Sequence, residues 1–435
     1  MEKTTGTSLA RNGLKPLHGE PEVYVMHYDT DTKPKVRMTI DERRKKERCA
    51  EQDIEYQHEQ KWMESSRKKL RMIVSAHVDD LKGGASKKDA ENFLAFLNKK
   101  FGTCKSEWNK FAHTGVEHER LADGIFCHQF SYAQQLNAMS HPRGDQTSED
   151  LVDEEMHEAY SSLLGGVAWL ALTRADVAVW TQALQRRGHA PRHVDCYRLN
   201  KVLSWIKRHP LGIMYRRIEC ERVRILGFTD AAYKTQPDDN TALALRGLAV
   251  LLAPDDTVST QAWEKQEIIQ HAVAKPMMIH LLSWTVRKLK RVVRSTFAAE
   301  LNALIDTIES LLLLQLMLHQ CYCGTDESAE ELLIKQDYGK LYPPIDIFVD
   351  AKSVTEAISA KEVCTPSEQS LKVHLITIRD RLLRGLLRTI SWTDTRDMVA
   401  DALTKGTIER TMIEDVMKGG LKIQHKMLTF GGKRA

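Results

Sequence analysis

The segment "ILGFTDAAY" (residues 225–233) ends an apolar run with an acid. Side chains in a β-strand alternate between two faces, so Leu226, Phe228 and Asp230 share one face if this segment is a strand. The two hydrophobic residues predict that this face packs on a core, where an unpaired carboxylate is costly. The pattern therefore predicts a buried strand in which Asp230 has a role other than packing.

The chain after residue 223 alternates between short apolar runs and helical patterns. We expect strands at 223–230, 244–253, 279–287, 345–350 and 388–393, helices at 295–319, 352–360, 367–386 and 397–405, and a polar insert at 324–342. Three strands followed by alternating helices and strands indicate an α/β domain with a mixed sheet and flanking helices.

The chain before residue 223 differs in composition and in the pattern of its expected elements. Residues 41–71 hold 18 Asp, Glu, Lys or Arg residues among 31, with both signs mixed. This composition predicts a solvated helix or an insertion, and the eight acids disfavour the alternative of a nucleic-acid-binding arm. We expect a strand at 22–28, before this segment. After it we expect a strand–turn–strand at 71–85, a helix capped by Ser86, a hairpin that turns at 122–124, and helices at 131–139, 155–172, 176–187 and 194–208.

Bulk composition excludes several classes of protein. The chain has 435 residues, of which 42% are apolar, and a net charge of +4, which permits a nucleic-acid partner without requiring one. Eight cysteines lack any CxxC or zinc spacing, which indicates reduced thiols inside a cell. The N-terminus lacks the apolar region of a secretory signal. The longest apolar run, near 308–318, is shorter than the ~18–20 residues of a membrane span, so we expect a buried helix and no membrane partner.

Four acids in the C-terminal part lie where a structural role is hard to supply. Asp230 ends the first strand, and Asp350 ends the strand "IDIFVD". Glu300 borders the apolar stripe of the helix "STFAAELNAL", and Asp401 lies in the short helix "VADALTK". Each acid alone could be a cap, a turn residue or a half-exposed helix residue. Together they predict a carboxylate cluster that needs cations, and hard oxygen ligands favour Mg²⁺ or Mn²⁺. Two such ions suit the hydrolysis of a phosphodiester.

The stretches "FTDAAY", "SWTVRKLKRVVRSTFAAELNAL", "IFVDAKSV" and "VADALTKG" resemble the ribonuclease H domain of copia-type retrotransposon Pol polyproteins. The resemblance implies a ribonuclease H-like fold and two Mg²⁺ or Mn²⁺ ions. Asp230, Glu300, Asp350 and Asp401 would be the catalytic metal ligands. The implied reaction is hydrolysis of the RNA strand of an RNA/DNA hybrid. Related transposases and integrases would instead run Asp, Asp, Glu.

A basic run precedes Glu300. It contains Arg287, Lys288, Lys290, Arg291 and Arg294. Such a run could bind the backbone phosphates of a hybrid. The alternative is a solvated connection between a strand and a helix.

The stretch "AHVDDLKGG" is similar to the reverse-transcriptase motif that carries two catalytic aspartates in a hairpin, here Asp79 and Asp80. Alone, two aspartates in a hairpin indicate only a turn. The resemblance continues to residue 222 and implies the palm end, thumb and connection of a partial α+β reverse transcriptase. Polymerase chemistry also needs an aspartate from an earlier strand, and residues 1–70 contain no convincing counterpart. We therefore expect a truncated polymerase part without DNA synthesis of its own.

These observations divide the chain into four expected segments. They are a charged segment at 1–70, the partial reverse transcriptase at 71–222, the ribonuclease H-like domain at 223–410 and a tail at 411–435. The leading hypothesis is a retrotransposon fragment that cuts RNA/DNA hybrids, with other polyprotein parts as further partners, in the cytoplasm within a virus-like particle or in the nucleus. The alternatives are an inactive remnant that only binds nucleic acid or merely folds, and a host protein that has reused the fold for binding.

Overall fold

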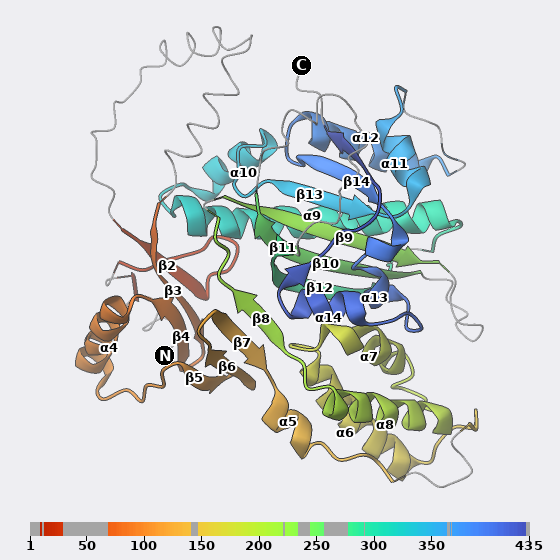
Figure 1. Ribbon diagram of the computed structural model, residues 1–435, viewed down its shortest axis with the longest axis horizontal. Helices are drawn as coiled ribbons and strands as arrows, with labels where there is room; N and C mark the ends of the chain where they lie inside the picture. The colour runs from red at the N-terminus through yellow and green to blue at the C-terminus, as the bar shows by residue number, and fades with distance from the viewer. Residues whose placement is uncertain are drawn as a thin grey trace. The chain divides into compact units, whose positions relative to one another are not determined.

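A computed structural model (Figure 1) describes most of the chain. The described residues are 9–10, 13–28, 68–140, 147–220, 222–233, 244–255, 277–290, 292–362, 366 and 368–431. Contacts within the chain group these residues into two compact units. Unit 1 comprises Met1–Ser106 and Leu313–Pro343, and unit 2 comprises Glu107–Leu312 and Pro344–Ala435. Residues 41–67 of the charged segment lie outside the described residues.

Unit 1 contains a four-stranded antiparallel sheet in the order β1-β2-β3-β4. The strands are β1 (Lys15–Pro16), β2 (Val23–His27), β3 (Leu70–His77) and β4 (Asp80–Ala85). The expected strand–turn–strand is therefore confirmed. Met72 and Val74 alternate with more exposed residues of β3 and pack with Leu9 and Leu14.

Helix α4 (Lys87–Phe101) follows this sheet and begins as expected, because the hydroxyl of Ser86 accepts a hydrogen bond from the backbone N–H of Asp89. A second helix in unit 1 corrects the sequence reading. Residues 324–342 form more than a polar insert, because they contain α10 (Ala329–Asp337). Ser328 and Glu331 form a reciprocal capping box, and Leu332 packs with Leu341 on the end of α9.

Unit 2 contains a six-stranded mixed sheet in the order β12-β10-β9-β13-β14-β16. β9 is antiparallel to β10, β10 is antiparallel to β12, and β9 is parallel to β13. β13 is parallel to β14, which pairs antiparallel with β16. The strands are β9 (Val223–Ala232), β10 (Leu245–Pro254), β12 (His280–Lys288), β13 (Ile345–Val349), β14 (Thr389–Thr393) and β16 (Met427–Gly431). The predicted α/β class with a mixed sheet is confirmed.

The two faces of this sheet are covered by different helices. Helix α9 (Thr296–Cys323) runs across one face (Figure 1), where a Cβ on Gly227 would meet Leu311 at 2.5 Å. On the other face a Cβ on Gly247 would meet Leu403 of α13 (Asp401–Thr404) at 2.9 Å. Leu226 and Phe228 point to this second face, where they belong to one buried cluster with Leu403. The alternation that the sequence predicted for this strand is therefore confirmed.

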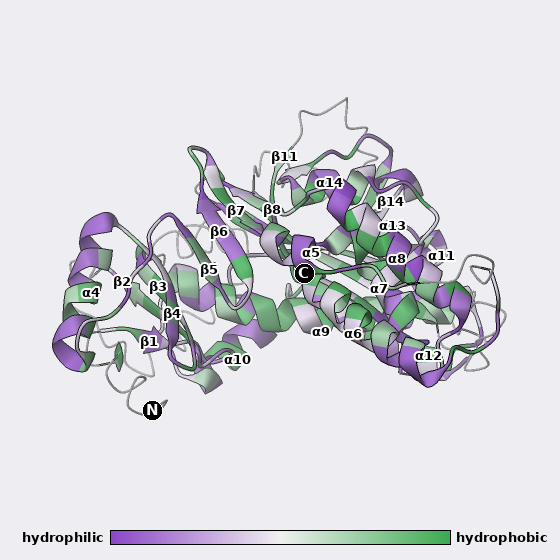
Figure 2. Cartoon of the chain, turned by 90° about the horizontal axis from the view of Figure 1, so that it is seen from below, coloured by the Kyte–Doolittle hydropathy of each residue, from purple (hydrophilic) through white to green (hydrophobic). Residues whose placement is uncertain are grey.

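Among the described residues, one helix, α9, is long and apolar enough to cross a membrane by length and composition. Figure 2 shows hydrophobic residues along much of α9, in contrast to the hydrophilic α4. Many of its apolar side chains, including Leu304, Ile308 and Leu311, are fully buried in the protein. The packing of α9 on the sheet explains its apolar composition.

A helical layer and a small sheet precede the large sheet in unit 2. The helices are α5 (Phe130–Gln135), α6 (Glu154–Leu170), α7 (Ala178–Gln185) and α8 (His193–Arg208). Their shared core includes Tyr160, Val167 and Leu199. The expected hairpin near 122–124 is confirmed as β6 (Val116–Arg120) and β7 (Gly124–His128), between β5 (Lys110–His113) and β8 (Ile213–Arg216) in an antiparallel sheet.

The C-terminal region differs from the sequence reading in two places. The helix expected at 397–405 is a 3₁₀ turn, η4 (Thr395–Asp397), followed by the four-residue α13. The expected tail contains α14 (Thr411–Met417) and the edge strand β16, so the six-stranded sheet extends beyond residue 410. The expected segment boundaries at 70, 222 and 410 stay predictions.

Candidate metal centre

Strand β9 places Asp230 at the end of the buried face that Leu226 and Phe228 share. Asp230 is 2% exposed. Its Oδ2 accepts a hydrogen bond from the hydroxyl of Thr404 on α13. A carboxylate at this depth persists only if other groups satisfy or neutralise it.

Helix α9 brings Glu300 to the same end of the sheet. The helix begins after Ser295, whose hydroxyl accepts a hydrogen bond from the backbone N–H of Ala298 at 3.1 Å. This start places Glu300 in the second turn, where it is 4% exposed and accepts a hydrogen bond from the backbone N–H of Ala231. Its Oε2 has no hydrogen-bond partner among the described residues. Burial, together with the charges of Asp230 and Asp350, raises the pKa of Glu300 to about 9.

Asp350 directly follows the last residue of strand β13. Val349 pairs with Thr229 across the parallel β9–β13 ladder, so the next residue on each strand, Asp350 and Asp230, lies at the same edge of the sheet. Asp350 Oδ2 accepts a hydrogen bond from the Thr395 hydroxyl at 3.1 Å. Burial and the charge of Asp230 raise the pKa of Asp350 above its ordinary value.

These three acids form one cluster. Each of Asp230, Glu300 and Asp350 offers a carboxylate oxygen, and these oxygens lie within 4.8 Å of one another. Three hard oxygen donors suit a divalent cation such as Mg²⁺ or Mn²⁺, and Glu300 adds a buried oxygen that has no hydrogen-bond partner within the described part of the chain. The residues that the sequence singled out 50 and 70 positions apart (350 − 300 and 300 − 230) therefore meet in space.

Asp401 borders this cluster and is paired with a lysine. The Lys405 ammonium lies 2.6 Å from Asp401 Oδ1 and 3.7 Å from Asp230 Oδ1. Burial and the charge of Asp230 raise the pKa of Asp401 to about 7, although Lys405 opposes this shift. The pKa of Lys405 is itself raised, because the attraction of Asp230 and Asp401 outweighs the effect of its burial.

Three further residues contact the acids but were not predicted as site residues: Lys405, Thr404 and Thr395. Only the spacing of Lys405, four residues after Asp401, carried a signal, because residues i and i+4 of a helix are neighbours. The two threonines have no sequence pattern that connects them with acids more than 40 residues away.

Asp79 and Asp80 lie in unit 1, whereas the carboxylate cluster lies in unit 2. Asp79 is in the turn between β3 and β4, and Asp80 is the first residue of β4. Both are exposed. Within the described part of the chain, neither belongs to a group of three side chains that could hold a metal ion.

The expected basic run begins on β12. Arg287 and Lys288 end this strand, and Lys290 and Arg294 lie in the connection to α9, whereas Arg291 lies outside the described residues. Arg287, Lys290 and Arg294 are exposed. A neighbouring basic pair had not been predicted. Burial and the positive charges of Arg186 and Arg187, at the end of α7, lower the pKa of Lys288.

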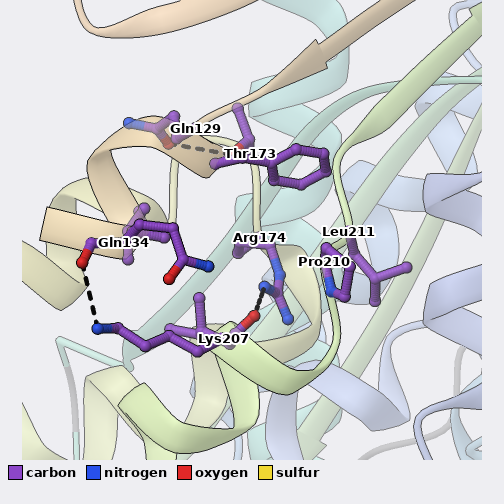
Figure 3. A pocket seen from close by; sticks show the side chains of 11 residues that line it. Gln129, Gln134, Thr173, Arg174, Lys207, Pro210 and Leu211 are labelled. Carbon is purple, nitrogen blue, oxygen red and sulfur yellow. Dashed lines mark hydrogen bonds between the residues drawn. The ribbon is translucent and has the colours of Figure 1, made fainter. Parts of the chain in front are cut away.

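A cavity of about 170 Å³ lies elsewhere in unit 2 (Figure 3), and several of its polar groups form hydrogen bonds or ion pairs within the protein. Arg174 forms an ion pair with Asp176, and Lys207 donates to the backbone carbonyl oxygen of Leu136 at 2.6 Å. The side chains of Thr173 and Gln129 form a hydrogen bond of 3.0 Å. The predicted site residues are absent from the cavity wall, so it is not the candidate site. The wall comprises Gln129, Phe130, Ala133, Gln134, Leu170, Thr173, Arg174, Ile206, Lys207, Pro210 and Leu211.

Part of the chain is similar in sequence to a known protein. The chain is 23% identical over 257 residues to the retrovirus-related Pol polyprotein from transposon RE1 of Arabidopsis thaliana. The match covers 59% of this chain and 14% of that polyprotein, so the chain spans a small part of the length of the relative. No family model matches the chain.

Two solved structures are similar to part of the chain. One is a crystal structure of LC11-RNase H1 in complex with an RNA/DNA hybrid. Its sequence is 14% identical to this chain, and the TM-score is 0.25. The similarity covers 43% of this chain and 99% of that one. The other is a structure of LC11-RNase H1 isolated from compost by a metagenomic approach. Its sequence is also 14% identical to this chain, with a TM-score of 0.24, and the similarity covers 43% of this chain and 97% of that one.

Proposed function

We propose that this chain is a retroelement Pol fragment whose unit 2 is a ribonuclease H-like nuclease that hydrolyses the RNA strand of RNA/DNA hybrids. One observation carries the proposal. Asp230, Glu300 and Asp350 converge to within 4.8 Å, and a buried Glu300 oxygen has no partner among the described residues. The similarity to a retrovirus-related Pol polyprotein supports a role in nucleic-acid processing.

The proposed ligands are Asp230, Glu300 and Asp350, with Asp401 as a further ligand beside them. When bound, two Mg²⁺ or Mn²⁺ ions supply Lewis-acid activation of a water and of the phosphodiester. Thr404 and Thr395 hold the carboxylates of Asp230 and Asp350 in fixed orientations through their hydroxyl groups. These hydrogen bonds pre-organise the ligands before a cation binds.

Substrate binding would fall to the basic residues around β12. We propose that Arg287, Lys288, Lys290, Arg291 and Arg294 contact hybrid phosphates. Arg186 and Arg187 would extend this surface, since their charges act on Lys288. Contacts with phosphates give affinity that does not depend on the base sequence. Selectivity for a hybrid would come from groove shape and 2′-hydroxyl contacts.

Asp79 and Asp80 would be the remaining part of a polymerase site in a segment related to reverse-transcriptase palm, thumb and connection. We propose that this chain alone does not synthesise DNA. The support is that the described residues bring no third acid to these two aspartates.

Cleavage of a 5′-labelled RNA strand annealed to DNA tests the nuclease proposal. The expected result is RNA cleavage with Mg²⁺ or Mn²⁺ that stops with a chelator and in Asp350→Asn. The matched control is Asp415→Asn, which changes an exposed acid of α14 and should cleave like the unchanged protein. Cleavage that survives Asp350→Asn would overturn the assignment of the site.

A second candidate function is binding of nucleic acid without cleavage, which the basic residues around Lys288 favour. The same experiment separates the two. A folded protein that binds the hybrid and the metal but leaves the RNA intact would support this second function.

A further inference from the structure

Lys405 occupies an unusual place for a lysine. Its ammonium lies between two buried acids, 2.6 Å from Asp401 and 3.7 Å from Asp230. Asp230 also belongs to the group of three carboxylates that can hold a cation, whereas Asp401 is outside that group of three. One side of the acidic cluster therefore faces a positive charge that belongs to the chain itself.

The backbone of Lys405 is held independently of its ammonium. The Arg410 guanidinium donates to the carbonyl oxygens of Ala402 and Lys405, the latter at 3.0 Å. It also stacks 4.5 Å from the ring centroid of Trp180 on α7. The next residue, Gly406, accepts a hydrogen bond at 2.8 Å from the same indole. These contacts fix the C-terminal end of the four-residue helix α13, so the ammonium of Lys405 is not needed as an ordinary helix-stabilising group.

Charge counting shows what the ammonium does for the cluster. Asp230, Glu300, Asp350 and Asp401 carry four negative charges when all are ionised. One divalent cation and Lys405 together supply three positive charges, which leaves the cluster close to neutral. A second divalent cation beside Asp401 would have to approach the ammonium, and like charges a few ångströms apart repel each other in a partly buried site.

We propose that Lys405 is the built-in counter-cation of this cluster. In the protein without substrate, its ammonium takes the place of a second divalent ion beside Asp230 and Asp401. Only one ion then binds tightly, through Asp230, Glu300 and Asp350. The inference rests on the metal site of the proposed function.

Calorimetric titration of chelator-treated protein with Mn²⁺ tests the inference. We expect one tight site in the unchanged protein. Lys405→Met keeps the length of the side chain and removes the charge, and we expect it to bind a second Mn²⁺ about tenfold more tightly, or better, than the unchanged protein does. The spin resonance of the variant should then show two coupled Mn²⁺ ions, because metal ions in such paired sites lie only ~4 Å apart.

Two control variants isolate the charge of Lys405. Lys405→Arg keeps the charge and should still bind one tight ion. Lys418→Met breaks another lysine pair with an acid four residues away, Glu414, and should leave the number of bound ions unchanged. Lys405→Gln is the second neutral variant if the methionine variant does not fold.

The outcomes separate this inference from the proposed function. Two equally tight Mn²⁺ ions in the unchanged protein, or a single ion in the folded neutral variants, would overturn the role of Lys405. One tight ion in the unchanged protein and two in Lys405→Met would support it even if no hybrid is cleaved. Absence of Mn²⁺ binding to the folded protein would overturn both the metal site and the inference.

Discussion

Gly247 of β10 pairs directly with Asp230 of β9 across the antiparallel ladder, and α13 lies against the glycine. A Cβ at this position would lie 2.8 Å from Thr404 Cγ2, 2.9 Å from Leu403 Cβ and 3.0 Å from the Ala400 carbonyl oxygen. The helix that carries Asp401 therefore approaches Asp230 only because residue 247 has no side chain. This close approach brings the Thr404 hydroxyl to the Asp230 carboxylate.

Gly247→Ala should disturb both the core and the metal site. We expect a loss of about 1–3 kcal/mol in the free energy of unfolding, because α13 must shift, and weaker Mn²⁺ binding, because Thr404 and Asp401 shift with it. Urea unfolding and Mn²⁺ titration measure the two effects. The control Gly165→Ala adds a methyl group at an open, exposed position of α6 and should stabilise the protein by up to about 1 kcal/mol. Equal effects of the two changes would contradict this account.

Glu300→Gln should separate metal binding from folding. An amide has nearly the same shape as the buried carboxyl group but carries no charge beside Asp230 and Asp350. We expect the variant to be at least as stable as the unchanged protein in chelator, and to lose the gain that Mg²⁺ or Mn²⁺ confers. For the unchanged protein this gain is about 2.7 kcal/mol when the free ion is at 100 times its Kd. Thermal unfolding with and without the ion measures it, and an undiminished gain in Glu300→Gln would remove Glu300 from the ligand set.

Asp346→Asn should make the free energy of unfolding less dependent on pH in the acidic range. Asp346 is fully buried, and Arg388 donates to its Oδ1 at 2.9 Å, which keeps the pKa of Asp346 below its ordinary value although burial opposes this shift. A depressed pKa means that the stabilisation is complete above the ordinary value near 3.8 and is lost as the pH falls through the folded value. We expect a cost of about 3 kcal/mol at pH 7, because Arg388 loses one of its two buried partners and keeps the other, Asp255.

Urea unfolding of Asp346→Asn at pH 7, 5 and 3 measures this dependence. The difference from the unchanged protein should narrow below pH 4. The control is Asp380→Asn, which removes an exposed partner of Arg384 and should cost less than about 0.5 kcal/mol at every pH. A constant difference down to pH 3 for Asp346→Asn would show that its ionised form does not stabilise the fold.

Asp79→Asn and Asp80→Asn should leave hybrid cleavage unchanged. The two residues are exposed in the β3–β4 hairpin of unit 1, and the proposed nuclease residues are all in unit 2. Primer extension on an RNA template should give no product with the unchanged protein. A product that disappears in Asp79→Asn would establish polymerase activity and contradict the proposal.

Lys288→Ala should weaken hybrid binding and reduce its dependence on salt. Removal of one lysine–phosphate interaction should lower the slope of log affinity against log salt by about 0.9 if the bound duplex behaves as B-form DNA does. Arg186→Ala should act in the same direction if α7 belongs to the binding surface. Lys372→Ala on α12 (Ser370–Leu383) is the matched control and should leave the slope unchanged. Equal slopes for all four proteins would exclude an interaction of Lys288 with a phosphate.

Local pattern was sufficient to predict most strands and helices of unit 2. Alternation along 223–230 predicted a strand with Asp230 on its buried face, because the side-chain period of a strand is a local property. Shorter elements escaped prediction. Helix α10 depends on one capping box and one buried residue, Leu332, and β16 is an edge strand whose pairing with β14 no local pattern indicates.

Alternation and helical period act over a few residues, so they suffice to predict that Asp230, Glu300 and Asp350 end or border apolar elements. Which of these acids meet depends on contacts between distant parts of the fold. The parallel register of β9 and β13 sets Asp350 beside Asp230, and the packing of α13 over Gly247 brings Lys405 to Asp401 and Asp230. The contacts of Asp230 join it to residues 120 and 175 positions away (350 − 230 and 405 − 230). They depend on strand register and side-chain volume, which the periodicity of a short segment does not specify.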